Sequence, residues 1–251
     1  SNAVRSLVLG LTGARFGSAP GDGYTRRFYR KLSRYSANLA LVSDISMLML
    51  GGRLKFKESL SARLGDVLSQ LYIASSILKR YEDNDRPAGD RPLLAWAMHD
   101  AIHKIELALS GALRNFPIKP VGWALWLLVF PLGRRAHAPG DRLGHRVAAV
   151  LMNPSDTRDR LGNGTFLTPC ANNPAGRIND GLPKAVAAEP VERKFQKAMK
   201  AGEIHAHGFE AQLQEAQLKG VLNASEVALL QELQAITLDA ITVDDFDPSE
   251  L

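Results

Sequence analysis

The chain has 251 residues, 45% of them hydrophobic and 23% charged, which is enough to enclose a hydrophobic core. This composition excludes a disordered chain and a collagen-like fibre, and the single cysteine, Cys170, excludes an internal disulfide. Basic residues exceed acidic ones by 11 over residues 1–150, whereas acidic residues are in excess by 6 over the remainder. The basic part predicts an anionic partner: phospholipid, nucleic acid, a phosphate-bearing ligand or the chain's own acidic end.

The first 23 residues are expected to lie outside the folded core. Ser1-Asn2-Ala3 is typical of an expression scar, and residues 10–23 contain five glycines and Pro20. Burial in such a segment is too small to offset its ordering entropy. Residues 1–23 are therefore predicted to be a scar and a linker.

Three long amphipathic helices are predicted next. Apolar residues recur at steps of three and four over residues 24–51, 59–81 and 92–117, which places them on one face of each helix. Short polar breaks separate these segments, so the helices are expected to pack antiparallel. A fourth helix is expected to join them, formed either by residues 121–132 or by residues 143–152.

The rest of the chain is expected to be less regular. Half of residues 162–183 are Gly, Pro or Asn, which predicts a long loop. Shorter helices are predicted over residues 190–201, 209–219 and 225–241, before an acidic end at residues 243–248. The predicted fold class is all-α: an antiparallel bundle of three to four long helices over residues 24–161. Residues 162–251 are expected to pack on the same bundle.

No motif in the sequence predicts catalysis, a bound cofactor or a metal. His99, His103 and Glu106 share a helix face, but the chain has neither the HExxH nor the CxxC spacing of zinc sites. Cys170 has no histidine near it in the sequence, and an isolated cysteine of this kind is usually a small apolar residue. We expect no catalytic, cofactor-binding or metal-binding residue in this chain.

The strongest candidate for an interaction surface is the segment 119–135. It contains two of the three tryptophans, is apolar on every side and is flanked by cations. These are features of a helix at an anionic membrane surface, although a helix buried in the bundle would also be apolar all round. The candidate contact residues are Trp123, Trp126, Phe130, Lys119, Arg134 and Arg135, together with a basic row on the first long helix, Arg26, Arg30 and Arg34. The basic row is not accompanied by a helix suited to contact base edges or by aromatic side chains on which bases could stack, so no nucleic-acid partner is predicted.

Several stretches spread over residues 24–248 form an ordered set: SARLGDVLSQLY (61–72), LKRY (78–81), NFP (115–117), FPLGR (130–134), LTP (167–169), NPAG (173–176) and VDDFDP (243–248). Together they resemble the C-terminal domain of the large bacterial FAD-dependent acyl-CoA dehydrogenases of fatty-acid β-oxidation. The resemblance covers nearly all of the chain.

The resemblance implies that this chain is one part of a longer enzyme. FAD, the acyl-CoA pocket and the glutamate base belong to an upstream flavoprotein body, which converts acyl-CoA to trans-2-enoyl-CoA. The role implied for this chain is a non-catalytic domain that docks on that body and binds the cytoplasmic side of the bacterial inner membrane. The alternative role is a protein–protein assembly module that forms a homodimer without membrane contact.

Overall fold

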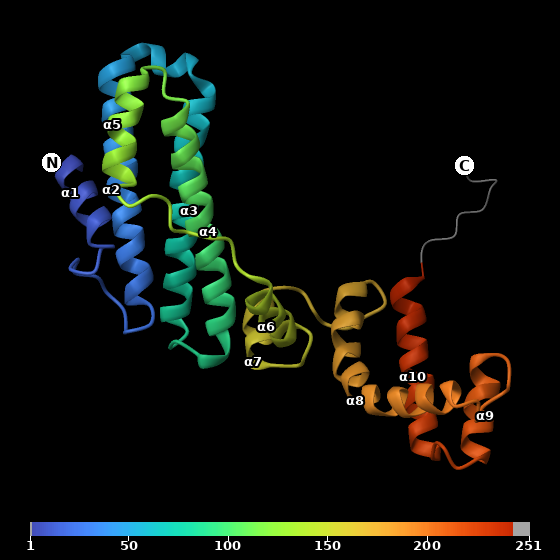
Figure 1. Ribbon diagram of the computed structural model, residues 1–251. Coiled ribbons are helices and arrows are strands. Elements are labelled where there is room, and N and C mark those ends of the chain that lie inside the picture. Colours follow the sequence, from blue (N-terminus) through green and yellow to red (C-terminus); the bar gives the residue numbers. More distant parts are fainter. Residues whose placement is uncertain (1, 243–251) are drawn as a thin grey trace, which may run out of the picture. The chain divides into compact units, whose positions relative to one another are not determined.

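The computed structural model describes residues 2–242 of the chain (Figure 1). Within these residues there are ten α-helices and no strand, which confirms the predicted all-α class. The helices form two compact units, Ser1–Ala148 and Ala149–Leu251.

The first unit is built on the three predicted long helices, α2 (Arg26–Leu50), α3 (Glu58–Asp83) and α4 (Arg91–Arg114). Figure 1 shows them running up, down and up, joined by the short 3₁₀ turns Gly51–Phe56 and Ala88–Asp90. Their apolar faces meet in one core, whose fully buried members include Phe28, Val42, Val67, Leu78, Met98, Ile105 and Leu109. The regular spacing of these side chains explains why the sequence predicts all three helices correctly.

The helix that joins the three long ones in the bundle is α5 (Lys119–Val129), which corresponds to the first of the two predicted alternatives. Its side chains Leu125 and Val129 are buried in the core that α2, α3 and α4 form. By contrast, α6 (Asp141–Leu151) buries none of its residues.

The predicted linker is helical in its first part, over residues 2–11, and irregular only after Leu11. Helix α1 (Asn2–Leu11) packs against α2 and α5. The Asn2 amide donates a hydrogen bond to the Asp44 carboxylate, with Nδ2 and Oδ2 2.8 Å apart. At Gly10, an added Cβ would lie 2.9 Å from Pro131, so this glycine permits close helix packing and does not mark a loop.

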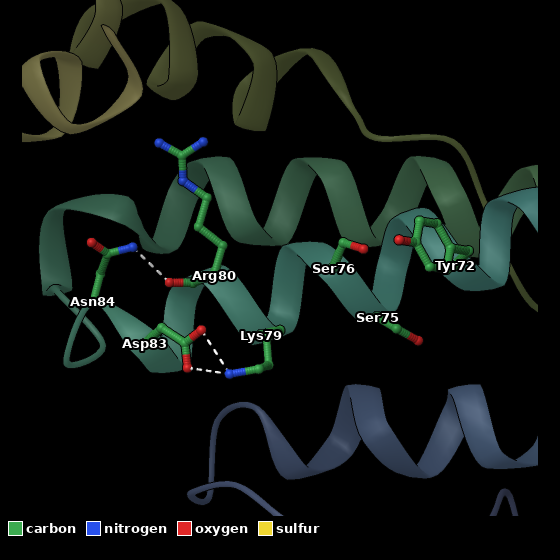
Figure 2. Close-up of a pocket in the computed structure, with 7 residues that line it drawn as sticks. All are labelled: Tyr72, Ser75, Ser76, Lys79, Arg80, Asp83 and Asn84. Atoms are coloured by element: carbon green, nitrogen blue, oxygen red, sulfur yellow. Dashed lines mark hydrogen bonds and ion pairs between the residues drawn. The ribbon is translucent and has the colours of Figure 1, made fainter. Parts of the chain in front are cut away.

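The outer face of α3 carries a shallow groove (Figure 2). Polar side chains dominate it, and the Lys79 ammonium lies 2.6 Å from the Asp83 carboxylate one turn later. Helix α3 supplies the lining, with its C-cap Asn84: Tyr72, Ser75, Ser76, Lys79, Arg80, Asp83 and Asn84. Such a lining is typical of a solvated helix face.

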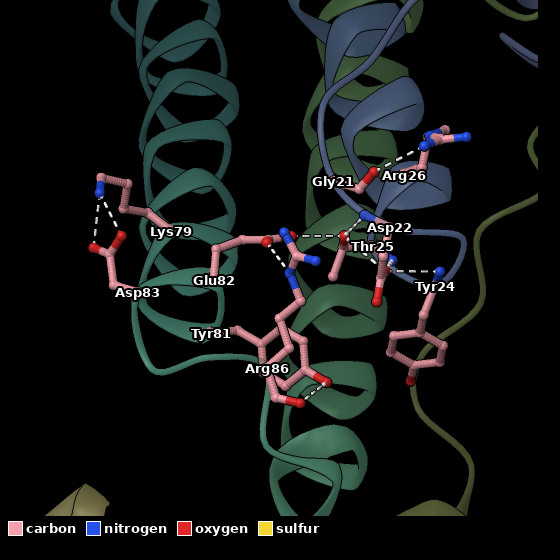
Figure 3. A network of polar contacts seen from close by, with 10 residues as sticks. All are labelled: Gly21, Asp22, Tyr24, Thr25, Arg26, Lys79, Tyr81, Glu82, Asp83 and Arg86. Atoms are coloured by element: carbon pink, nitrogen blue, oxygen red, sulfur yellow. Dashed lines mark hydrogen bonds and ion pairs between the residues drawn. The ribbon is translucent and has the colours of Figure 1, made fainter.

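A polar network ties the turn before α2 to the end of α3 (Figure 3). The Asp22 carboxylate accepts the Thr25 backbone N–H at 2.8 Å, and the Thr25 hydroxyl donates to Glu82 at 2.7 Å. Arg86 completes the network through an ion pair with Glu82. Gly21 has φ of +87°, and a Cβ there would lie 2.3 Å from the Thr25 hydroxyl oxygen, so only glycine fits this turn.

The second unit contains α7 (Asp156–Gly162), α8 (Pro174–Lys200), α9 (Phe209–Leu218) and α10 (Ala224–Ile241). Its core is separate from that of the first unit. Helices α9 and α10 confirm two of the predicted short helices. Residues 243–248, the predicted acidic end, lie outside the described residues.

Helix α8 is longer than predicted, and the loop before it is correspondingly shorter. Asn173 caps the helix by accepting the Gly176 N–H at 3.1 Å, and Pro174 occupies the first turn, where its missing donor costs nothing. Pro183 and Pro190 lie inside the helix, which Figure 1 shows to be bent. A helix held by its packing tolerates prolines at the cost of a kink, which composition alone cannot show.

Glu215 on α9 holds the loop that precedes this helix, and its pKa gives a pH prediction. Its carboxylate contacts the Lys219 ammonium at 2.6 Å and accepts the N–H groups of Ala206 and His205 at 2.7 and 2.8 Å. The Lys219 contact, then these two N–H groups, lower the pKa of Glu215 from its ordinary value to about 2. A carboxyl whose pKa is lower in the folded state stabilises that state above its unfolded pKa, near 4.5.

We therefore expect the second unit to lose stability as the pH falls from about 4.5 to about 2. The measurement is urea unfolding at several pH values, followed by the NMR methyl signals of Leu213 and Leu230. The Glu215→Gln variant should lose part of this acid dependence. Equal pH dependence in the two proteins would show that Glu215 does not contribute.

Candidate functional site

Helix α5 is buried on one side and exposed on the other. Trp123 and Leu127, one turn apart, are 71% and 65% exposed, whereas Leu125 and Val129 are almost fully buried. We call Trp123 and Leu127 the α5 ridge. The helix therefore packs into the bundle on one face and exposes large apolar side chains on the other.

Trp126 and Phe130 lie on the packed side of α5. Phe130 is 2% exposed, and its ring centroid is 5.1 Å from that of the half-buried Trp126. The Arg114 guanidinium lies 5.4 Å from the centre of the Trp126 ring. The structure therefore places Phe130 in the core, not on a contact surface as the sequence suggests.

The predicted flanking cations lie before and after the α5 ridge in the sequence and differ in exposure: Lys119, Arg134 and Arg135. Lys119 is exposed, and its ammonium donates to the Arg114 carbonyl at 3.1 Å, near the start of α5. After α5, Arg135 is exposed and Arg134 is half-buried, with Leu132 46% exposed beside them. Cationic side chains therefore occur on both sides of the ridge along the chain.

The predicted basic row on α2 is mainly structural. Its three arginines donate hydrogen bonds to backbone carbonyls: Arg26 to Gly21 at 3.0 Å, Arg30 to Gly17 at 3.1 Å and Arg34 to Val129 at 3.1 Å. Arg34 is 8% exposed. Helical spacing shows that these side chains share a face, but it does not reveal the loop and the helix end that cover that face.

A buried carboxylate fixes the connecting segment, residues 130–140, to the bundle. Glu106 on α4 is fully buried, and it accepts the Tyr35 hydroxyl at 2.7 Å and the N–H groups of Arg135 and Ala136 at 3.0 and 2.9 Å. Burial, then the Glu106 carboxylate, raise the pKa of Tyr35, which keeps its hydroxyl a donor. We call these contacts the Glu106 latch.

His103 and Glu106, which share a helix face with His99, both contact the connecting segment. His103 Nδ1 lies 3.2 Å from the Ala136 carbonyl oxygen, and both Glu106 oxygens already accept hydrogen bonds. Over residues 2–242, no three His, Cys, Asp or Glu side chains gather as metal ligands do. Cys170 lies exposed in the loop before α8.

The groove on α3 does not fit FAD. An isoalloxazine ring needs an enclosing, mostly apolar pocket, whereas the groove on α3 is an open helix face lined by charged and hydroxyl side chains (Figure 2). Separately, no helix in the described part of the chain combines the length and apolar character that crossing a bilayer requires.

The comparison with known families agrees with the motifs. A family model described as "Acyl-CoA dehydrogenase, C-terminal, bacterial type" matches residues 1–246, which is nearly the whole chain. The match confirms the resemblance that the ordered motifs indicate. No solved structure matches the chain.

Proposed function

Because this chain belongs to the bacterial-type acyl-CoA dehydrogenase C-terminal family, we propose that it is a non-catalytic domain whose α5 ridge binds an anionic membrane surface. The family implies FAD in the full-length enzyme. Oxidation of acyl-CoA to trans-2-enoyl-CoA would take place on the flavoprotein body. The domain would hold that body at the cytoplasmic face of the bacterial inner membrane, where long acyl chains are available.

The exposure of Trp123 and Leu127 is the observation that supports membrane binding. Burying one large apolar side chain contributes about 1.5–3 kcal/mol, so the pair would contribute about 3–6 kcal/mol if both inserted. Each nearby cation adds about 1 kcal/mol at an anionic surface, and Lys119 and Arg135 are exposed. This total supports reversible, peripheral binding.

Docking on the flavoprotein body is supported by a second apolar surface, on α1. Val4, Val8 and Leu11 follow each other at helical spacing and are 62%, 50% and 52% exposed. The opposite side of α1 packs on α2 and α5. We propose that this stripe contacts the flavoprotein body, because an exposed apolar stripe on a packed helix is typical of an interface.

The experiment that tests membrane binding removes the ridge. We expect the double variant Trp123→Ser, Leu127→Ser to bind phosphatidylglycerol vesicles at least about tenfold more weakly in co-sedimentation, since about 1.4 kcal/mol is a factor of ten. The matched control is Trp96→Ser, Leu68→Ser, which removes the same residue types from exposed positions on α4 and α3. Equal binding by the ridge variant and the wild type, with both folded by circular dichroism, would reject the proposal.

The homodimer alternative predicts a different result for the same variants. If the ridge is a dimer contact, the wild-type chain should sediment as a dimer without vesicles and the ridge variant as a monomer. Our proposal instead predicts that the ridge variant leaves the sedimentation coefficient unchanged. Sedimentation velocity over a range of concentrations distinguishes the two.

A further inference from the structure

Two cations of α2 differ from the arginines that donate to backbone carbonyls. Arg27 and Lys31 lie one turn apart and are exposed, and neither forms an ion pair within residues 2–242. The Arg27 guanidinium rests on aromatic rings, 4.4 Å from the centroid of Tyr24 and 4.7 Å from that of Phe28. Its polar edge is therefore held in a defined place without a carboxylate partner.

Helix α4 brings a third basic side chain, His99, to the same place. The Phe28 ring meets the His99 ring edge-on, with centroids 6.2 Å apart. Two helical turns further along, the Tyr35 hydroxyl donates a hydrogen bond to the Glu106 carboxylate. Both contacts join residues 71 positions apart, so α2 and α4 run parallel and in register. This register sets His99 level with Arg27.

The electrostatics of these groups show mutual repulsion. Burial lowers the pKa of His99, and the charges of Lys31 and Arg27 lower it further. Burial and then Arg27 likewise lower the pKa of Lys31, while Glu106 opposes this. A bound anion stabilises the charged forms of His99 and Lys31, whose pKa values burial and neighbouring cations lower.

In the described part of the chain, no acidic side chain forms an ion pair with Arg27 or Lys31. Glu106 is buried, and its oxygens accept three hydrogen bonds in the latch. Asp100, which follows His99 in the sequence, pairs with Lys104 at 2.7 Å. The charge of the cluster therefore remains available to a ligand.

We propose that Arg27, Lys31 and His99 form a binding site for a phosphate group, carried either by a lipid headgroup or by a free phosphorylated molecule. A guanidinium binds two phosphate oxygens at once, and an ammonium and an imidazolium add charge-assisted hydrogen bonds. The site uses residues of α2 and α4 only, so it does not depend on the α5 ridge.

The test uses the 251-residue chain with labelled histidines, and pyrophosphate at constant ionic strength as the probe. We expect a saturable shift of the His99 ring signals and a rise of the His99 pKa, because a bound anion favours imidazolium. His99→Gln identifies the signal. Arg27→Gln and Lys31→Gln should each weaken binding about tenfold, the effect of losing one charge-assisted contact. The control Arg53→Gln, Lys57→Gln removes two exposed cations from the turn between α2 and α3 and should bind as the wild type does.

The remaining arms identify the source of the phosphate. If phosphatidylglycerol vesicles shift the His99 ring signals and phosphatidylcholine vesicles do not, the phosphate belongs to a lipid headgroup. If pyrophosphate shifts these signals and neither kind of vesicle does, the ligand is a free phosphorylated molecule. Citrate at equal charge should shift His99 far less. The proposal is overturned if neither phosphate source shifts His99, if citrate acts equally well, or if Arg27→Gln binds like the control.

Discussion

Replacing Glu106 by alanine is expected to destabilise the first unit by about 3 kcal/mol, because three donors lose their acceptor and each unpaired group costs about 1–3 kcal/mol when buried. The Tyr35 hydroxyl is buried, while the N–H groups of Arg135 and Ala136 are partly buried and regain water if the connecting segment detaches. All three tryptophans lie in the first unit, so their fluorescence during urea unfolding measures this change.

Two further variants separate the latch from a general effect of mutation. Glu106→Gln keeps one oxygen for the two N–H groups and can donate to Tyr35, so it should cost less than alanine. Tyr35→Phe removes one hydrogen bond and should cost about 1 kcal/mol. Equal stability of Glu106→Ala and the wild type would show that the latch does not hold the connecting segment.

Replacing Phe130 by alanine is expected to cost about 3–5 kcal/mol, the usual range for deleting a buried aromatic side chain. The ring is 2% exposed and packs against Trp126, so the deletion leaves a cavity at the end of α5. Urea unfolding followed by far-ultraviolet circular dichroism measures the loss.

Trp123→Ser is the matched control for this deletion. Trp123 is 71% exposed, so its removal should change the free energy of unfolding by no more than about 0.5 kcal/mol. The pair therefore distinguishes the buried Phe130, which stabilises the fold, from the exposed Trp123, which does not. A large loss in Trp123→Ser, or none in Phe130→Ala, would contradict this assignment of the two faces of α5.

The long helices could be predicted from sequence because their apolar side chains repeat over six or seven turns. Helix α1 was missed because Gly10 and the glycines after it suggest a loop, whereas Gly10 lies where α1 closely approaches Pro131. The sequence does not predict the full extent of α8 because half of residues 162–183 are Gly, Pro or Asn, whereas the helix begins at Pro174 and continues through Pro183. Amino-acid composition indicates only the local preference for helix or loop, and tertiary contacts override that preference in α1 and in the first half of α8.

The candidate site could be predicted only in part. A tryptophan-rich segment with flanking cations identifies α5, but it cannot show that Phe130 faces the core and Trp123 faces outward. Loop carbonyls and the end of α5 engage the basic row, Arg26, Arg30 and Arg34. Helical spacing does not distinguish these arginines from their neighbours Arg27 and Lys31, which form no ion pair within residues 2–242. Glu106 directly follows Ile105 in the apolar stripe, and a carboxylate in that position is the one sequence signal that indicates a buried polar contact.

The central claim is that α5 enters a membrane surface through its ridge, and the depth of Trp123 in the bilayer tests it most directly. A Trp96→Phe, Trp126→Phe variant leaves Trp123 as the only tryptophan. On phosphatidylglycerol vesicles containing brominated lipids, we predict a blue-shifted emission and strong quenching. Emission at the wavelength of the vesicle-free chain, with no quenching while the chain co-sediments, would contradict insertion of the ridge.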